Sequence, residues 1–178
     1  MKLINGEGQS IILALDVGTT QTGYCFVDEY SMKPLQFGKI DNEKIYNEIH
    51  KLADMNCKRR LVIEQFAHYG SKNPVGATTI EAITWNGKFI REAEQLGLSY
   101  EYVYRKEEKM LILGSMKGGD TEIRHALIQR FAKTDNGKGT KDNPDYFYGF
   151  ANDVWSAYCV ALVAIMRAKG ITKAKDWI

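Results

Sequence analysis

Two short apolar runs, each closed by an acidic residue, constrain the fold of this chain more than any other feature. Residues 11–15 (Ile-Ile-Leu-Ala-Leu) precede Asp16, and residues 61–63 (Leu-Val-Ile) precede Glu64. Continuous apolar runs of this length between turn residues are typical of buried strands. A carboxylate at the end of such a strand stands at the rim of the core, where loss of hydration is costly unless it meets a cation. The pattern therefore predicts two buried strands whose acids converge if the strands are neighbours.

Further strands and helices alternate along the rest of the chain. Strands are expected over residues 23–27, 35–40 and 100–104, and helices around residues 45–52, 78–96, 123–131 and 152–169. The first three strands follow one another closely, which favours an antiparallel meander. The resulting order, βββ-α-β-α-β-α-α, predicts an α/β protein with an RNase H-like fold, in which helices flank a mixed five-stranded sheet.

The length and composition favour one soluble domain. The 178 residues are expected to form a single domain over residues 1–178. The polar segment 134–144, rich in Gly, Asn, Asp and Lys, is interpreted as a mobile loop. We expect no membrane association, because no apolar run reaches the roughly 18 residues of a membrane span. The N-terminus lacks an apolar signal region, and the three cysteines are widely spaced. We therefore expect a cytoplasmic protein, in a bacterial cell or a phage-infected host.

Charge distribution says more about partners than net charge. The formal net charge is only +2, but residues 105–141 contain nine Lys or Arg against five Asp or Glu. Basic stretches of this kind can follow a phosphate backbone, although they are also common on solvated helix faces.

The acids at the strand ends suggest a metal site. Convergent carboxylates suit Mg²⁺, a hard cation that is bound by oxygen ligands and water. Asp153 is the only acid within the last apolar helix, and its place in the first turn is favoured by the helix dipole. The candidate metal ligands are therefore Asp16, Glu64 and Asp153.

Several segments resemble the RuvC-type Holliday junction resolvases, from about Ile11 to Met166. Asp16-Val17-Gly18 followed by Thr22-Gly23-Tyr24 is similar to the opening of this family, and Ile63-Glu64-Gln65 to its second catalytic segment. Arg105 and Lys109 resemble its basic stretch after the fifth strand. Asp153-x-x-Ser156-Ala157 is similar to its last helix, where a second acid usually follows the first.

The resemblance implies a crossover junction endodeoxyribonuclease. It would be a homodimer that binds four-way or other branched DNA, uses two Mg²⁺ ions per active site with Mn²⁺ as a substitute, and needs no nucleotide cofactor. Asp16 would bridge the ions, Glu64 and Asp153 would be further ligands, and Lys109 would stabilise the developing phosphorane charge.

The last helix departs from this pattern, because Ser156 stands where the second acid is expected. An alternative alignment places Asp153 in the second position and Phe150 in the first, and it also lacks one ligand. Ser156, Asn152, Asp145 or a water molecule could complete the metal site.

Candidate DNA contacts lie in four places. The aromatic pair Phe66 and Tyr69 could stack on unpaired bases near a junction centre. Lys117 lies in a glycine-flanked loop that could approach a phosphate. The remaining basic candidates are Arg105, Lys109, Lys58, Arg59 and Arg60.

Two other functions remain open from the sequence. Asp16-x-Gly18-Thr19-Thr20 also resembles the first phosphate loop of actin- and hexokinase-type sugar kinases and ATPases, but no second such loop follows. The serine at position 156 also leaves open a non-catalytic module that binds junctions or RNA.

Overall fold

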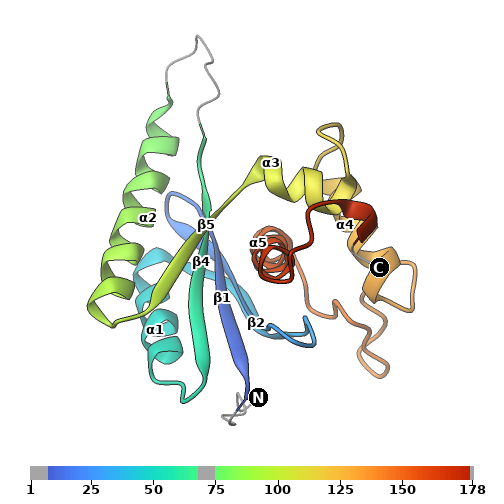
Figure 1. Cartoon of the computed structure of the whole chain (residues 1–178), viewed down its shortest axis with the longest axis horizontal. Coiled ribbons are helices and arrows are strands. Elements are labelled where there is room, and N and C mark those ends of the chain that lie inside the picture. The colour runs from blue at the N-terminus through green and yellow to red at the C-terminus, as the bar shows by residue number, and fades with distance from the viewer. Residues whose placement is uncertain (1–7, 68–74, 177–178) are drawn as a thin grey trace.

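A computed structural model describes residues 8–67 and 75–176 of the chain. Its centre is a mixed five-stranded sheet in the order β3-β2-β1-β4-β5 (Figure 1). The strands are β1 (Ser10–Val17), β2 (Gln21–Asp28), β3 (Pro34–Asp41), β4 (Lys58–Gln65) and β5 (Ser99–Tyr104). The first three form an antiparallel meander, whereas β4 and β5 run parallel to β1. The predicted α/β, RNase H-like architecture is confirmed.

Helices cover both faces of the sheet. One face packs against α1 (Asn42–Ala53) and α2 (Ala77–Gln95), and the other against α5 (Asp153–Ala168) (Figure 1). Outside α5 lie α3 (Arg105–Glu108), the π-helical turn η1 (Lys109–Leu113), α4 (Asp120–Phe131) and the short 3₁₀ turn η2 (Ala174–Asp176). No helix in the described ranges is long and apolar enough to span a bilayer.

The alternation of β1 decides which face each of its side chains joins. Ile11, Leu13 and Leu15 belong to the core beneath α1 and α2, whereas Ile12 and Ala14 belong to the core beneath α5. Successive side chains of a strand point to opposite faces. Asp16 therefore points to the α5 side.

Helix α5 is the centre of its layer. Its residues are buried without a break from Ala157 to Met166, as the uniformly apolar sequence predicts. It is partly exposed at its first turn, with Asp153 and Ser156, and again at its last residues, Arg167 and Ala168. The helix therefore presents polar side chains where its two ends emerge from the core.

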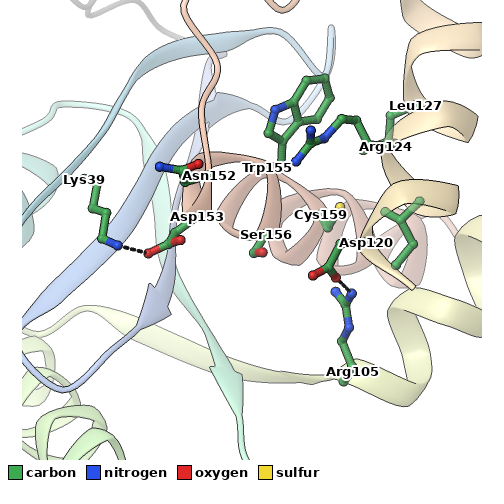
Figure 2. Close-up of a pocket in the computed structure, with 11 residues that line it drawn as sticks. Lys39, Arg105, Asp120, Arg124, Leu127, Asn152, Asp153, Trp155, Ser156 and Cys159 are labelled. Atoms are coloured by element: carbon green, nitrogen blue, oxygen red, sulfur yellow. Dashed lines mark hydrogen bonds and ion pairs between the residues drawn. The ribbon is translucent and has the colours of Figure 1, made fainter. Parts of the chain in front are cut away.

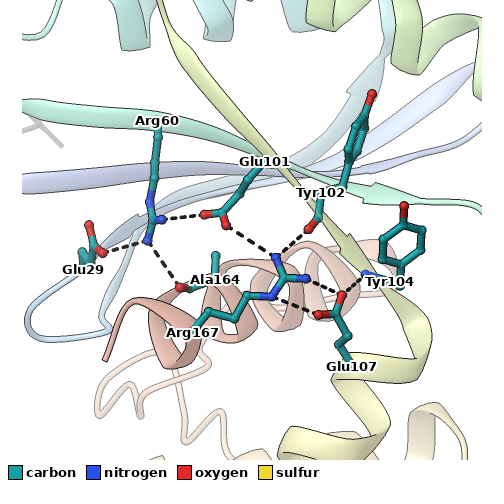
Figure 3. A network of polar contacts seen from close by, with 8 residues as sticks. All are labelled: Glu29, Arg60, Glu101, Tyr102, Tyr104, Glu107, Ala164 and Arg167. Carbon is teal, nitrogen blue, oxygen red and sulfur yellow. Dashed lines mark hydrogen bonds and ion pairs between the residues drawn. The ribbon is translucent and has the colours of Figure 1, made fainter. Parts of the chain in front are cut away.

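A network of charges fixes the other end of α5 to the sheet (Figure 3). Arg167 donates to the Tyr102 carbonyl at 2.6 Å and pairs with Glu107. Arg60 of β4 pairs with Glu29 at 2.7 Å and with Glu101 at 2.5 Å. These contacts hold both guanidinium groups between the sheet and the helix.

One segment differs from the sequence-based expectations. Residues 105–113 form α3 and η1, which were not predicted. In and beside the segment expected to be a mobile loop, residues 134–144, Asn136 accepts from Lys138 N and Gly139 N, and Asp145 accepts from Lys133 N and Thr134 N. Such side-chain-to-backbone bonds are typical of Asn and Asp in turns.

We predict that replacing Arg60 destabilises the fold. Arg60→Ala leaves Glu29 and Glu101 without their shared partner, which should lower the free energy of unfolding by about 1–3 kcal/mol. Lys58→Ala, at the exposed start of the same strand, should change it by no more than about 0.5 kcal/mol. Urea unfolding followed by circular dichroism measures both, and equal effects would contradict a structural role for Arg60.

Candidate active site

The strand register brings Asp16 and Glu64 together. Leu15 of β1 is paired with Ile63 of β4 in the parallel ladder, so the next residues, Asp16 and Glu64, lie on adjacent strands. Neighbouring strands are about 4.8 Å apart. Glu64 is two residues beyond Val62, which packs beneath α5, and therefore points to the same face as Asp16. Both carboxylates are only partly exposed to solvent.

Gly23 lets the first turn of α5 approach this pair. It is the partner of Asp16 across β1 and β2, and of Lys39 across β2 and β3. A Cβ atom at position 23 would lie 2.7 Å from the Cβ of Asp153, a distance that real side chains do not tolerate. Gly23 thus makes room for Asp153 beside Asp16.

Asp153 is held by a lysine that the sequence did not single out. Its carboxylate pairs with Lys39 Nζ at 2.6 Å (Figure 2). Lys39 occupies the same row of the sheet as Gly23 and Asp16. No local pattern marks this lysine, because its place at the site depends on the pairing of three strands.

Burial and nearby negative charges raise the pKa values of both strand-end acids. The pKa of Asp16 rises to about 7, first because of desolvation and then because of the charges of Glu64 and Asp153. A hydrogen bond with Ser156 acts in the opposite direction. The pKa of Glu64 also rises to about 7, through desolvation and then the charge of Glu108. The site therefore concentrates more negative charge than its surroundings neutralise.

Glu108 is a member of this cluster that the sequence analysis missed. Its side chain is 0% exposed, and one of its carboxylate oxygens pairs with Arg105. Desolvation raises its pKa to about 7. Glu108 precedes the buried residues Leu111 and Ile112 by three and four positions, a helical spacing that could have revealed its inward orientation.

The other predicted site residues are more scattered. Ser156 faces Asp16, and Phe66 is 41% exposed just beyond the end of β4. Lys109 lies near Glu122, and Lys117 is exposed on the loop before α4. Tyr69 lies outside the described residues.

The structure places several of the predicted basic contacts in ion pairs or away from the acids. Arg105 is bound between Glu108 and Asp120, so its guanidinium is directed to protein carboxylates. Lys58, Arg59 and Arg60 begin β4, whereas Glu64 is near its end. At about 3.3 Å per residue, the start of the strand is well removed from the acids.

The surroundings of the residues considered for the missing ligand position differ. Phe150, which fills that position in the alternative alignment, is 1% exposed in the aromatic core and provides no ligand atom. Asp145 accepts hydrogen bonds from Thr134 and from backbone amides, which lower its pKa to about 2. Asn152 remains at the edge of the site, exposed at the start of α5.

A cavity of about 290 Å³ adjoins the acids between α4 and the start of α5 (Figure 2). Its polar lining comes from several elements and contains both signs of charge: Lys39, Arg105, Asp120, Arg124, Asn152, Asp153 and Ser156. The guanidinium of Arg124 lies 5.2 Å from the Trp155 ring centroid. Three basic side chains, Lys39, Arg105 and Arg124, therefore line this cavity.

The acids fit a divalent metal in their chemistry. Asp16, Glu64, Asp153 and Glu108 offer only oxygen ligands, and the raised pKa values of Asp16, Glu64 and Glu108 show that a bound cation would stabilise their ionised forms. As the side chains stand, no three Asp, Glu, His or Cys residues in the described part of the chain already form a ligand group. Asp153 and Glu108 are paired with Lys39 and Arg105 instead. Metal binding would therefore replace part of these ion pairs by contacts between the carboxylates and the cation.

Comparison with known proteins supports the fold. The structure is similar to Thermus thermophilus RuvC in complex with a Holliday junction substrate, with a TM-score of 0.60 and 13% sequence identity over 92% of this chain and 98% of that one. A second structure of Thermus thermophilus RuvC gives a TM-score of 0.56 and 14% identity over the same shares. No protein-family model and no curated protein sequence matches the chain. The similarity therefore shows a shared RNase H-like architecture.

The raised pKa values predict an unusual pH dependence of stability. The native carboxyls keep their protons up to about pH 7, whereas the unfolded ones lose theirs near 3.8 for Asp16 and 4.5 for Glu64 and Glu108. The native state then binds more protons, and its stability falls as pH rises through about 7. Without divalent ions, the melting temperature should fall between about pH 5 and pH 8.

The variant Asp16→Asn removes one of these carboxyls, so its melting temperature should depend less on pH. Mg²⁺ should raise the wild-type melting temperature more at the upper end of this range, where the acids are deprotonated. Differential scanning fluorimetry measures all of these changes. Identical pH profiles for wild type and variant would contradict the electrostatic description.

Proposed function

We propose that this chain is a divalent-metal-dependent DNA endonuclease that resolves four-way junctions and related branched DNA. The observation that carries the proposal is the placement of Asp16 and Glu64 at the ends of adjacent strands, with Asp153 brought beside Asp16 by Gly23. The same fold occurs in a protein whose solved complex contains a Holliday junction. Fold similarity alone does not specify activity, so the proposal rests on the site.

Asp16, Glu64 and Asp153 are the residues that would hold Mg²⁺ or Mn²⁺. When bound, the metal would supply an activated water and neutralise charge on the scissile phosphate. Asp16 is the central acid, because both Glu64 and Asp153 act on its pKa. Ser156 orients the Asp16 carboxylate through its hydroxyl.

Basic side chains around the acids would bind the DNA backbone. Lys39 and Arg124 line the cavity beside Asp153, and Lys117 projects from the glycine-flanked loop before α4. Lys109, at the start of η1, is proposed to stabilise charge on the phosphate during cleavage. Phosphate contacts of this kind give affinity for DNA of any sequence, so selectivity would come from junction shape.

Cleavage of both strands of a junction requires two active sites, which favours a symmetric homodimer. Helix α2 offers an apolar surface for it: Ile80 is 55% exposed and Ile83 is 41% exposed. Phe89 and Ile90 of the same helix are buried in the core, so they do not belong to the proposed contact. Trp85 is partly buried and packs against Phe89.

The experiment that tests the function is cleavage of a synthetic four-way junction with Mg²⁺. Asp16→Asn should reduce cleavage by a factor of at least about 100, because it removes charge at the metal site, while junction binding is retained. Asp153→Asn should act in the same direction. Asp142→Asn changes an exposed loop acid and serves as the matched control, with wild-type activity expected.

Electrophoretic mobility shifts in Ca²⁺ or EDTA measure binding separately from cleavage. Binding without any metal-dependent cleavage by the wild-type protein would support a non-catalytic junction-binding module. Wild-type cleavage by the Asp16→Asn variant would show that the catalytic site lies elsewhere.

A further inference from the structure

The buried carboxylate of Glu108 has one oxygen that its surroundings do not satisfy. One oxygen pairs with Arg105, whereas Oε1 is inaccessible to solvent and has no hydrogen-bond partner among the described residues. The whole side chain is 0% exposed. An unsatisfied buried charge costs free energy, so such a group in a folded protein calls for an explanation.

The position of Glu108 connects it with the proposed active site. Its charge acts on Glu64 and Asp16, and on Cys159, which follows Ser156 by one helical turn on α5. Glu108 lies on α3, which directly follows β5, whereas Asp153 packs against Gly23 of β2. Asp16 on β1 and Glu64 on β4 lie between these two strands in the sheet.

Helix α5 provides only one acid to this site. Asp153 is its sole Asp or Glu, and the residue one turn later, Ser156, presents a hydroxyl to Asp16. A neutral hydroxyl is a poorer ligand for a hard divalent cation than a carboxylate. A carboxylate from another element would supply the charge that α5 lacks.

We propose that Glu108 is a further carboxylate ligand of the metal site, and that Arg105 is the residue that positions it. The inference rests on the proposed function in treating the acids as a metal site. Arg105 holds one oxygen of Glu108 and leaves Oε1 for the cation. It also pairs with Asp120, whose side chain is 77% exposed, so that α3 and the start of α4 are held together.

A purely structural ion pair is the alternative. In that case Glu108 exists to neutralise Arg105, and its loss should destabilise the protein whether or not metal is present. A ligand role predicts the reverse: metal affinity falls while the metal-free protein keeps its stability, because removing a charge from a repulsive cluster offsets the lost ion pair.

The test is Mn²⁺ binding to the full chain without DNA, measured by isothermal titration calorimetry at about pH 8, where the acids are ionised. Glu108→Gln should weaken Mn²⁺ binding roughly tenfold or more. Glu107→Gln is the matched control on the same short helix: it makes the same charge change, but Glu107 pairs with Arg167. Its Mn²⁺ affinity should equal that of the wild type.

A second variant tests whether the two positions compensate. Adding Ser156→Asp to Glu108→Gln restores a carboxylate on α5 and should recover most of the lost Mn²⁺ affinity. Equal affinity of wild type and Glu108→Gln would overturn the inference, as would a metal-free melting temperature lowered more by Glu108→Gln than by Glu107→Gln.

Junction cleavage by the wild type separates this inference from the proposed function. Cleavage with Mn²⁺ affinity independent of Glu108 would refute the ligand role and leave the function standing. Affinity dependent on Glu108 without any cleavage would support the ligand role and refute the function.

Discussion

The burial of two neighbouring carboxyl groups, Asp16 and Glu64, is the constraint on which the rest of the structure depends. Both acids end strands whose preceding residues are fully buried, and desolvation is the main reason that their pKa values rise to about 7. Such a pair is costly in a fold unless a cation offsets it. The surrounding basic residues offset this cost only in part: Lys39 pairs with Asp153 and Arg105 with Glu108, and although Arg105 also acts to lower the pKa of Glu64, that pKa still rises to about 7.

The sheet and α5 together fix the positions of Asp16 and Glu64 relative to Asp153. The parallel register of β1 and β4 sets the acids side by side, and Gly23 lets α5 begin directly above their row. At its other end α5 is fixed through Arg167 to the β5 backbone. A helix anchored in this way can hold Asp153 in one place, as a binding site for a small cation requires.

The sequence predicted what depends on local pattern. The apolar runs of β1 and β4 predicted two strands of the sheet and the acids near their ends. The uniformly apolar sequence of α5 predicted the buried helix and the acid in its first turn. Lys39 and Glu108 escaped prediction, because strand pairing and the packing of a four-residue helix place them at the site. The basic cluster at the start of β4 illustrates the same point: Lys58 is exposed at the first residue of the strand, whereas Arg60, on the same face, is paired with Glu29 and Glu101, partners that no local pattern indicates.

The central claim is that the strand-end acids form a cation site, and a crystal structure grown with Mn²⁺ tests it most directly through anomalous scattering. The account predicts an anomalous peak in contact with the carboxylate oxygens of both Asp16 and Glu64. Manganese bound only at other surface acids, with Asp16 and Glu64 free of metal at saturating concentration, would contradict it.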